Sequence, residues 1–112
     1  MAHAVIWSPA AQVDISEIGA YLEAKVSANT AKNVIMAIRA APYRVNDFPL
    51  TAYQTPELNS RIYRETSAKR YRVLFRIEAN SLVITRIVRE GRLLANVPGS
   101  FEEAEQEAYA AI

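Results

Sequence analysis

The chain has 112 residues, of which 51% are hydrophobic and 22% are charged, and its formal net charge is +1. A chain of this length forms one domain that buries roughly 65% of its unfolded surface, so it needs no disulfide or metal to hold it together. It has no cysteine, no apolar run near the ~20 residues of a membrane span and no signal-peptide pattern, so we expect a cytoplasmic protein rather than a membrane protein.

The first half of the chain predicts one strand and two helices. The apolar run at 4–7 (AVIW) is typical of a strand, and Ser8 with Pro9 suits the N-cap and first position of a helix. Asp14 lies off the apolar stripe of that helix, in the N-terminal half that favours acids. The stripe itself has three- and four-residue spacings, at Ala11, Ile15, Ile18, Leu22 and Val26.

A second helix follows a break at 27–29, with Asn29 or Thr30 as its cap. Pro42 lies inside its apolar pattern and removes an amide that would bond to the Ile38 carbonyl, so we expect a kink or a split there. The short break predicts an antiparallel helix hairpin. The apolar pattern consists of Val34, Ile38, Ala41, Val45 and Phe48.

Strands dominate the second half, after a loop at 49–60. We expect strands at 61–65, 70–78 and 81–89, with a turn at Ala79-Asn80 between the last two. The middle strand alternates cleanly: Tyr71, Val73, Phe75 and Ile77 form an apolar face, and Arg70, Arg72, Leu74, Arg76 and Glu78 form an outward face. The last strand has less distinct faces, so we expect both to be partly covered: Val83, Thr85 and Ile87 on one, and Leu82, Ile84, Arg86 and Val88 on the other.

These elements predict a single α+β domain in the order β-α-α-β-β-β-α. A helix hairpin should pack on one face of a largely antiparallel four-stranded sheet, with the core at about 4–94. Ser100 and Glu103 form a capping box ahead of an acidic C-terminal helix at about 100–111.

The charge is unevenly distributed along the chain. Residues 101–112 contain four glutamates and no base, whereas residues 1–100 carry thirteen bases against eight acids. Nine of the thirteen bases lie between Arg61 and Arg92. The small net charge is therefore the sum of an acidic C-terminal segment and a basic remainder. The basic remainder suits contact with phosphate or an acidic protein. One hypothesis is that the tail folds back over the basic sheet; the alternative is a solvated end helix or a dimer contact.

Taken in order, these pieces resemble the RelE/ParE superfamily of toxins from bacterial type II toxin–antitoxin systems. The matching segments are WSPAAQVDISEIGAYL, the segment at Arg61, KRYRVLFRI and ITRIVREGR, and together they span about residues 5–94. The resemblance implies an antitoxin whose C-terminal segment wraps the toxin, and implies no cofactor. We expect a homodimer or a heterotetramer with the antitoxin. It also implies one of two targets: ParE-like members bind and inhibit DNA gyrase, and RelE-like members cleave mRNA in the ribosome.

The basic residues suit binding better than RNA cleavage. Arginine stabilises negative charge, but it holds its proton too tightly to act in general acid–base catalysis. Glu90 stands where many family members have a histidine, with Gly91 and Arg92 retained. We therefore favour a ParE-like gyrase inhibitor over a RelE-like nuclease. The candidate contacts for target or antitoxin are Arg61, Arg64, Arg70, Arg72, Arg76, Arg86, Arg89 and Arg92.

Three alternatives stay open. A nuclease would use Glu90, Arg61, Arg72 and Arg92, with Glu65 as another base and Tyr63 or Tyr71 as proton donor. A non-toxic nucleic-acid-binding or adaptor module ranks third, because the sheet lacks exposed aromatic residues for base stacking. The arginines could also simply solvate the sheet or pair with nearby acids. With no cysteine and one histidine, we expect no metal site.

Overall fold

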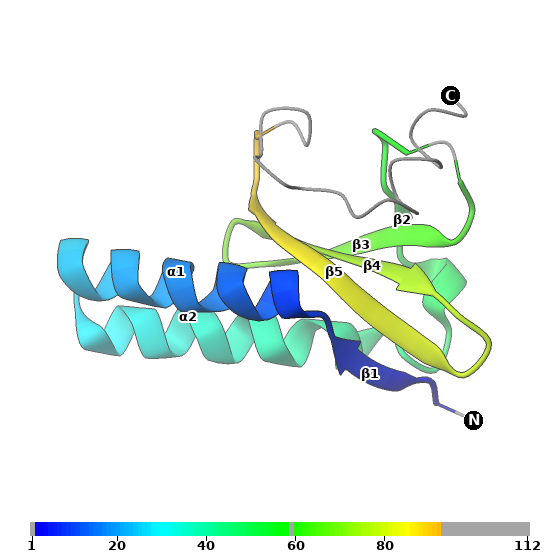
Figure 1. The fold of residues 1–112 in the computed structure, drawn as a ribbon, viewed down its shortest axis with the longest axis horizontal. Coiled ribbons are helices and arrows are strands. Elements are labelled where there is room, and N and C mark those ends of the chain that lie inside the picture. The colour runs from blue at the N-terminus through cyan, green and yellow to red at the C-terminus, as the bar shows by residue number, and fades with distance from the viewer. Residues whose placement is uncertain (1, 59, 93–112) are drawn as a thin grey trace.

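The computed structural model describes residues 2–58 and 60–92 (Figure 1). Its elements in chain order are β1 (Ala4–Trp7), α1 (Pro9–Lys25), α2 (Ala28–Ala40), the 3₁₀ helices η1 (Ala41–Arg44) and η2 (Pro49–Thr51), β2 (Tyr53–Gln54), β3 (Tyr63–Ala68), β4 (Tyr71–Ile77) and β5 (Ser81–Arg89). The helix expected at about 100–111 lies outside the described residues, as do the capping box and the end of the core at residue 94.

The strands form one mixed sheet in the order β1-β5-β4-β3-β2, and the predicted α+β fold is confirmed. β1 runs parallel to β5, and the other neighbours are antiparallel. The sheet has five strands rather than the expected four, because Tyr53–Gln54 within the predicted loop pairs with Arg64 and Glu65. Figure 1 shows α1 and α2 side by side as the predicted antiparallel hairpin.

Side chains fix where the helices begin. The Ser8 hydroxyl accepts the amide of Ala11 at 3.1 Å and caps α1 as predicted. In α2 the cap is Ser27, not Asn29 or Thr30: its backbone is extended, and its hydroxyl accepts the amide of Thr30 at 3.0 Å.

The chain after α2 breaks where Pro42 predicts it. α2 ends at Ala40, and Pro42 lies in η1. Ala41 and Val45, the next members of the predicted apolar pattern, still pack in the core, whereas Phe48 is 72% exposed. Because the chain has left the α-helix before Phe48, the three- and four-residue spacing no longer places that side chain on the core side.

The main core lies between the helix hairpin and the sheet. It confirms the predicted apolar face of β4, since Val73 and Phe75 are fully enclosed and Tyr71 and Ile77 pack against them. Gly19 lets the two helices approach closely, because a Cβ atom there would lie 2.7 Å from Cδ1 of Ile35. Other members of the core are Ala11, Ile15, Ile38, Leu82, Ile84 and Ile87.

The assignment of faces in the last strand was wrong, because β5 contains a bulge. Leu74 pairs with Arg86 and Phe75 with Ile84, so Thr85 has no partner in the register. The extra residue breaks the two-residue alternation. Leu82, Ile84 and Ile87 therefore share the helix-side core.

The sheet face expected to point its arginines outward is also largely covered. Leu58, Leu74, Val83 and Val88 are at most 9% exposed although they lie outside the main core. The side chain of Arg72 on this face is 11% exposed. The expectation that both faces of the last strand are covered is thus confirmed, whereas a solvent-facing Arg72 is wrong.

Candidate protein-binding groove

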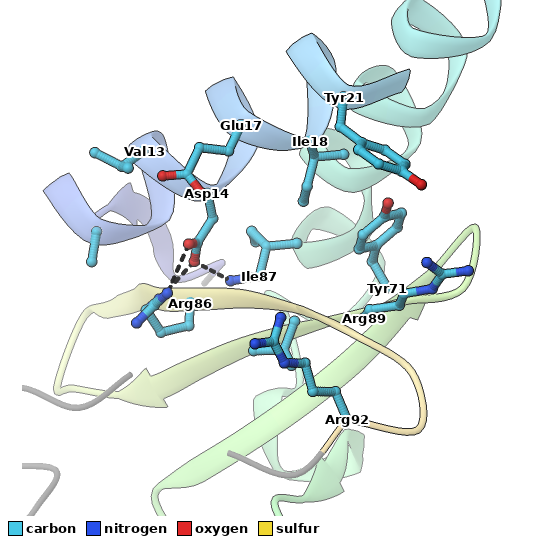
Figure 2. Close-up of a pocket in the computed structure, with 12 residues that line it drawn as sticks. Val13, Asp14, Glu17, Ile18, Tyr21, Tyr71, Arg86, Ile87, Arg89 and Arg92 are labelled. Carbon is cyan, nitrogen blue, oxygen red and sulfur yellow. Dashed lines mark hydrogen bonds and ion pairs between the residues drawn. The ribbon is translucent and has the colours of Figure 1, made fainter. Parts of the chain in front are cut away.

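A groove of about 690 Å³ runs between α1 and the outer part of β5 (Figure 2). Its helix wall includes Val13, Glu17, Ile18 and Tyr21, and its sheet wall includes Tyr71, Ile87, Arg89 and Arg92. The groove thus joins residues from both ends of the described chain, with β4 contributing one aromatic ring.

The groove exists because β1 pairs with only the first part of β5. The parallel register ends at Trp7 and Ile84. Beyond that point, Ser8 donates its amide to the carbonyl of Ile84 at 3.0 Å and its hydroxyl to the carbonyl of Thr85 at 3.1 Å. Asp14 then accepts the amide of Ile87 at 2.9 Å. The start of α1 therefore takes the place of a strand partner, and past Ile87 no strand of the described residues pairs with this edge.

Asp14 is the residue that fixes the helix to this edge. Besides the Ile87 amide, its carboxylate accepts two hydrogen bonds from the Arg86 guanidinium, at 2.7 and 2.8 Å. The two side chains are 10% and 12% exposed, so the pair is almost removed from water. The sequence pattern predicts only a charge in the N-terminal half of the helix at Asp14 and does not reveal this role. The one available signal is that Asp14 directly precedes Ile15, a member of the apolar stripe.

The groove combines apolar walls with a positively charged end. Val13 and Tyr21 are 54% and 55% exposed, so both present apolar area on the helix wall. Figure 2 shows the hydroxyls of Tyr21 and Tyr71 pointing toward one another across the groove. Arg89 and Arg92 are exposed at the C-terminal end of the strand. Such a cleft, with an open strand edge beside it, suits a peptide segment that carries apolar and acidic side chains.

Arg72 is held inside the protein by two carboxylates. Its guanidinium donates to Glu57 at 2.6 and 2.8 Å and to Glu65 at 2.7 and 3.0 Å. The hydrogen bond to Glu57 is the main cause of a raised pKa at Arg72; burial opposes it, and Glu65 adds to it. The positive charge of Arg72 is thus matched by two negative charges within the fold.

The other predicted contact residues divide into two groups. Arg64 donates to the carbonyls of Arg61 and Ala52, Arg76 pairs with Glu78 at 3.4 Å, and Arg86 pairs with Asp14. The exposed group is Arg61, Arg70, Arg89 and Arg92. Their roles in binding stay predictions.

The structure brings Arg70 and Arg89 to one end of the sheet and leaves Arg61 at the other. Arg70 accepts the amide of Glu90 at 2.8 Å through its carbonyl, and Arg89 pairs with Tyr71 in the next register position. Arg61 precedes Tyr63, which pairs with Arg76 near the far end of β4. At about 3.3 Å per residue, the five steps from Tyr71 to Arg76 correspond to roughly 17 Å.

Over 2–58 and 60–92, no group of three or more histidine, cysteine, aspartate or glutamate residues is placed to hold a metal ion. Within the same ranges, no helix has the length and apolar character to span a membrane.

Fold and groove together define a class: a small α+β protein, with a helix hairpin on a mixed sheet and a groove between the first helix and the last strand. The sequence matches the family described as ParE toxin of type II toxin-antitoxin system, parDE, over residues 5–94, so the chain belongs to the ParE toxin family. The predicted resemblance is confirmed at this level.

Among solved structures, a chain described as "Chromosomal ParDE TA system from P. aeruginosa" is similar in fold, with a TM-score of 0.66 and 16% sequence identity. The similarity covers 78% of this chain and 95% of that chain. Comparison with the sequences of curated proteins gave no match.

Proposed function

We propose that this protein is the toxin of a type II toxin–antitoxin pair, that it acts in the cytoplasm by binding and inhibiting DNA gyrase, and that its antitoxin binds in the groove between α1 and β5. Membership of the ParE family supports the first part. The arrangement of the charged residues supports inhibition by binding rather than by RNA cleavage.

The main support for the proposal is that the guanidinium of Arg72 is already paired with Glu57 and Glu65. A nuclease of the kind considered above needs this guanidinium to stabilise charge on a phosphate. Here Glu57 and Glu65 occupy it, and the side chain is 11% exposed. Bringing a phosphate to it would require breaking two ion pairs and leaving buried carboxylates without their partner, which costs several kcal/mol.

The second reason is distance within the candidate catalytic set. Glu90 lies beside Arg70 at one end of the sheet, and Arg61 lies near the other end. A general base and a charge-stabilising group must both lie within about 3 Å of the reacting atoms. These residues are therefore better suited to separate contacts on an extended surface.

The groove suits an antitoxin segment by its chemistry. Val13 and Tyr21 offer apolar area, Arg89 and Arg92 offer positive charge, and the edge of β5 past Ile87 offers backbone groups. An extended or helical peptide with apolar and acidic residues would satisfy all three. The antitoxin would then be held by packing and made specific by charge.

Two assays on purified toxin test the proposal: supercoiling by DNA gyrase, and cleavage of mRNA on translating ribosomes. We expect inhibited supercoiling and intact mRNA. Cleaved mRNA with normal supercoiling would reverse the assignment in favour of a RelE-like nuclease. If the protein neither inhibits supercoiling nor cleaves mRNA, the remaining assignment is a binding module without toxicity.

A further inference from the structure

The turn between β3 and β4 has a backbone conformation that does not suit its residues. Ala68 pairs with Tyr71, so the turn between them has two residues. These are Lys69 and Arg70, whose φ angles are 50° and 72°. Asparagine and glycine favour such a turn, because a larger side chain crowds its own backbone at positive φ. The turn thus keeps two neighbouring positive charges at a cost to stability, and strain of this kind is typical of functional sites.

The charges of this turn are not used inside the fold. Other arginines of the sheet pair with carboxylates. Lys69, Arg70 and Arg89 are exposed, and within the described residues their side chains form no hydrogen bond or ion pair. Arg89 lies at the same end of the sheet, since the carbonyl of Arg70 accepts the amide of Glu90 at 2.8 Å. Glu90 is the only acid among residues 67–71 and 89–91, so positive charge exceeds negative charge there.

Arg44 of η1 adds a fourth base beside the turn. Its guanidinium donates to the carbonyl of Ser67 at 2.6 Å, two residues before Lys69, and its side chain is exposed. A guanidinium has five N–H donors, so this bond leaves others for an anion. Four bases from η1, the turn and β5 therefore surround one end of the sheet. We call them the basic turn surface: Arg44, Lys69, Arg70 and Arg89.

The composition of this surface discriminates between classes of partner. A protein interface has an apolar centre with few charges, but none of the large apolar side chains exposed in the described chain lies on residues 66–71 or 89–92. Tyr71 is half-buried in the groove wall, so this end presents no exposed ring for stacking on an unpaired base. Surfaces that contact duplex DNA are polar and positive, and their arginines and lysines donate to phosphate oxygens.

We propose that the basic turn surface binds the phosphates of duplex DNA without reading the base sequence. In the inhibited complex the ligand is then the DNA that gyrase holds, a consequence that rests on the proposed function. Binding of free duplex DNA by the toxin alone does not depend on it.

The test measures binding of a fluorescently labelled DNA duplex to the full-length toxin over a range of salt concentrations. Each phosphate contact releases counterions, so four contacts should give a slope of about −3.6 when the logarithm of the association constant is plotted against that of the salt concentration. Lys69→Asn with Arg70→Gly should reduce the slope to about −1.8 and weaken binding at least about tenfold at about 50 mM salt. The new residues suit the turn better, so unfolding cannot explain the loss.

Two matched variants control for net charge. Lys25→Gln with Lys32→Gln removes two exposed bases from the helix hairpin and should change the affinity by less than about twofold. Glu90→Gln removes the acid beside the turn and should strengthen binding. Equal losses in the two double variants would overturn the proposal, because net charge would then determine binding. Tighter binding to single-stranded DNA or to duplex RNA would also overturn it, because duplex DNA would then not be the ligand.

The supercoiling assay separates this inference from the proposed function. If the toxin binds duplex DNA through these bases but does not inhibit supercoiling, the surface assignment stands and the gyrase assignment fails. If Lys69→Asn with Arg70→Gly weakens inhibition although the toxin alone binds no DNA, these bases contact an acidic surface of gyrase itself. That result would overturn the inference and leave the proposed function intact.

Discussion

Asp14 and Arg86 lie 72 residues apart in sequence and are joined by two hydrogen bonds of 2.7 and 2.8 Å. The same carboxylate accepts the amide of Ile87. One side chain of α1 thus satisfies both a guanidinium and a backbone group on the unpaired edge of β5. This contact joins the two walls of the groove.

Removing Asp14 should therefore destabilise the protein strongly. Asp14→Ala leaves Arg86 mostly buried without its ion-pair partner and the Ile87 amide without an acceptor. We expect a loss of about 3 kcal/mol in the free energy of unfolding, measured by urea denaturation. Asp14→Ala with Arg86→Met should recover part of this loss, because the buried charge is removed.

The control is Glu17→Ala, which removes an exposed carboxylate one turn further along α1. It should change the free energy of unfolding by no more than about 0.5 kcal/mol. A similar loss for both variants would mean that helix charge, rather than the buried pair, stabilises this region.

Arg72→Lys should also be costly, although it keeps the charge. A lysine ammonium is a point charge and cannot donate in a planar fork to both Glu57 and Glu65. We expect a loss of about 2 kcal/mol in thermal or urea unfolding. Arg61→Lys, at an exposed position, is the matched control and should be nearly neutral. If Arg72→Lys is also neutral, the two glutamates do not need the guanidinium geometry.

The turn between β3 and β4 should become more stable when its two residues are replaced by ones that adopt its backbone conformation more readily. Lys69 and Arg70 have φ angles of 50° and 72°, a left-handed conformation that asparagine and glycine adopt more readily. Lys69→Asn with Arg70→Gly should raise the free energy of unfolding by about 1 kcal/mol. Lys69→Ala with Arg70→Ala removes the same charges without relieving the backbone, so it should not stabilise the protein.

The exposed bases at this end of the sheet should matter for gyrase inhibition. Arg70→Gln with Arg89→Gln should weaken inhibition of supercoiling about tenfold, because charges at an interface accelerate association and stabilise the complex. Lys25→Gln with Lys32→Gln removes two exposed charges from the helix hairpin and should leave inhibition unchanged. Equal loss in both variants would indicate that net charge, not this surface, determines binding.

Much of the candidate site follows from local patterns and much does not. The basic character of residues 61–92 is visible in the sequence, and Arg70, Arg89 and Arg92 are exposed as expected. Arg72 and Arg86 have the same residue type but lie in buried ion pairs. An arginine on an alternating strand looks the same in sequence whether water or a carboxylate faces it, because its partner comes from a distant segment.

By itself the sequence determined the elements whose causes are local. Ser8 caps its own helix, Pro42 ends the second one through its missing amide, and the last strand has the predicted limits, Ser81–Arg89. The tertiary structure decided the rest: the parallel pairing of β1 with β5, the bulge at Thr85 that moves Leu82 and Ile84 to the helix side, and the engagement of Asp14 with Arg86. These features depend on which distant groups meet when apolar surface is buried, and only the folded chain brings those groups together.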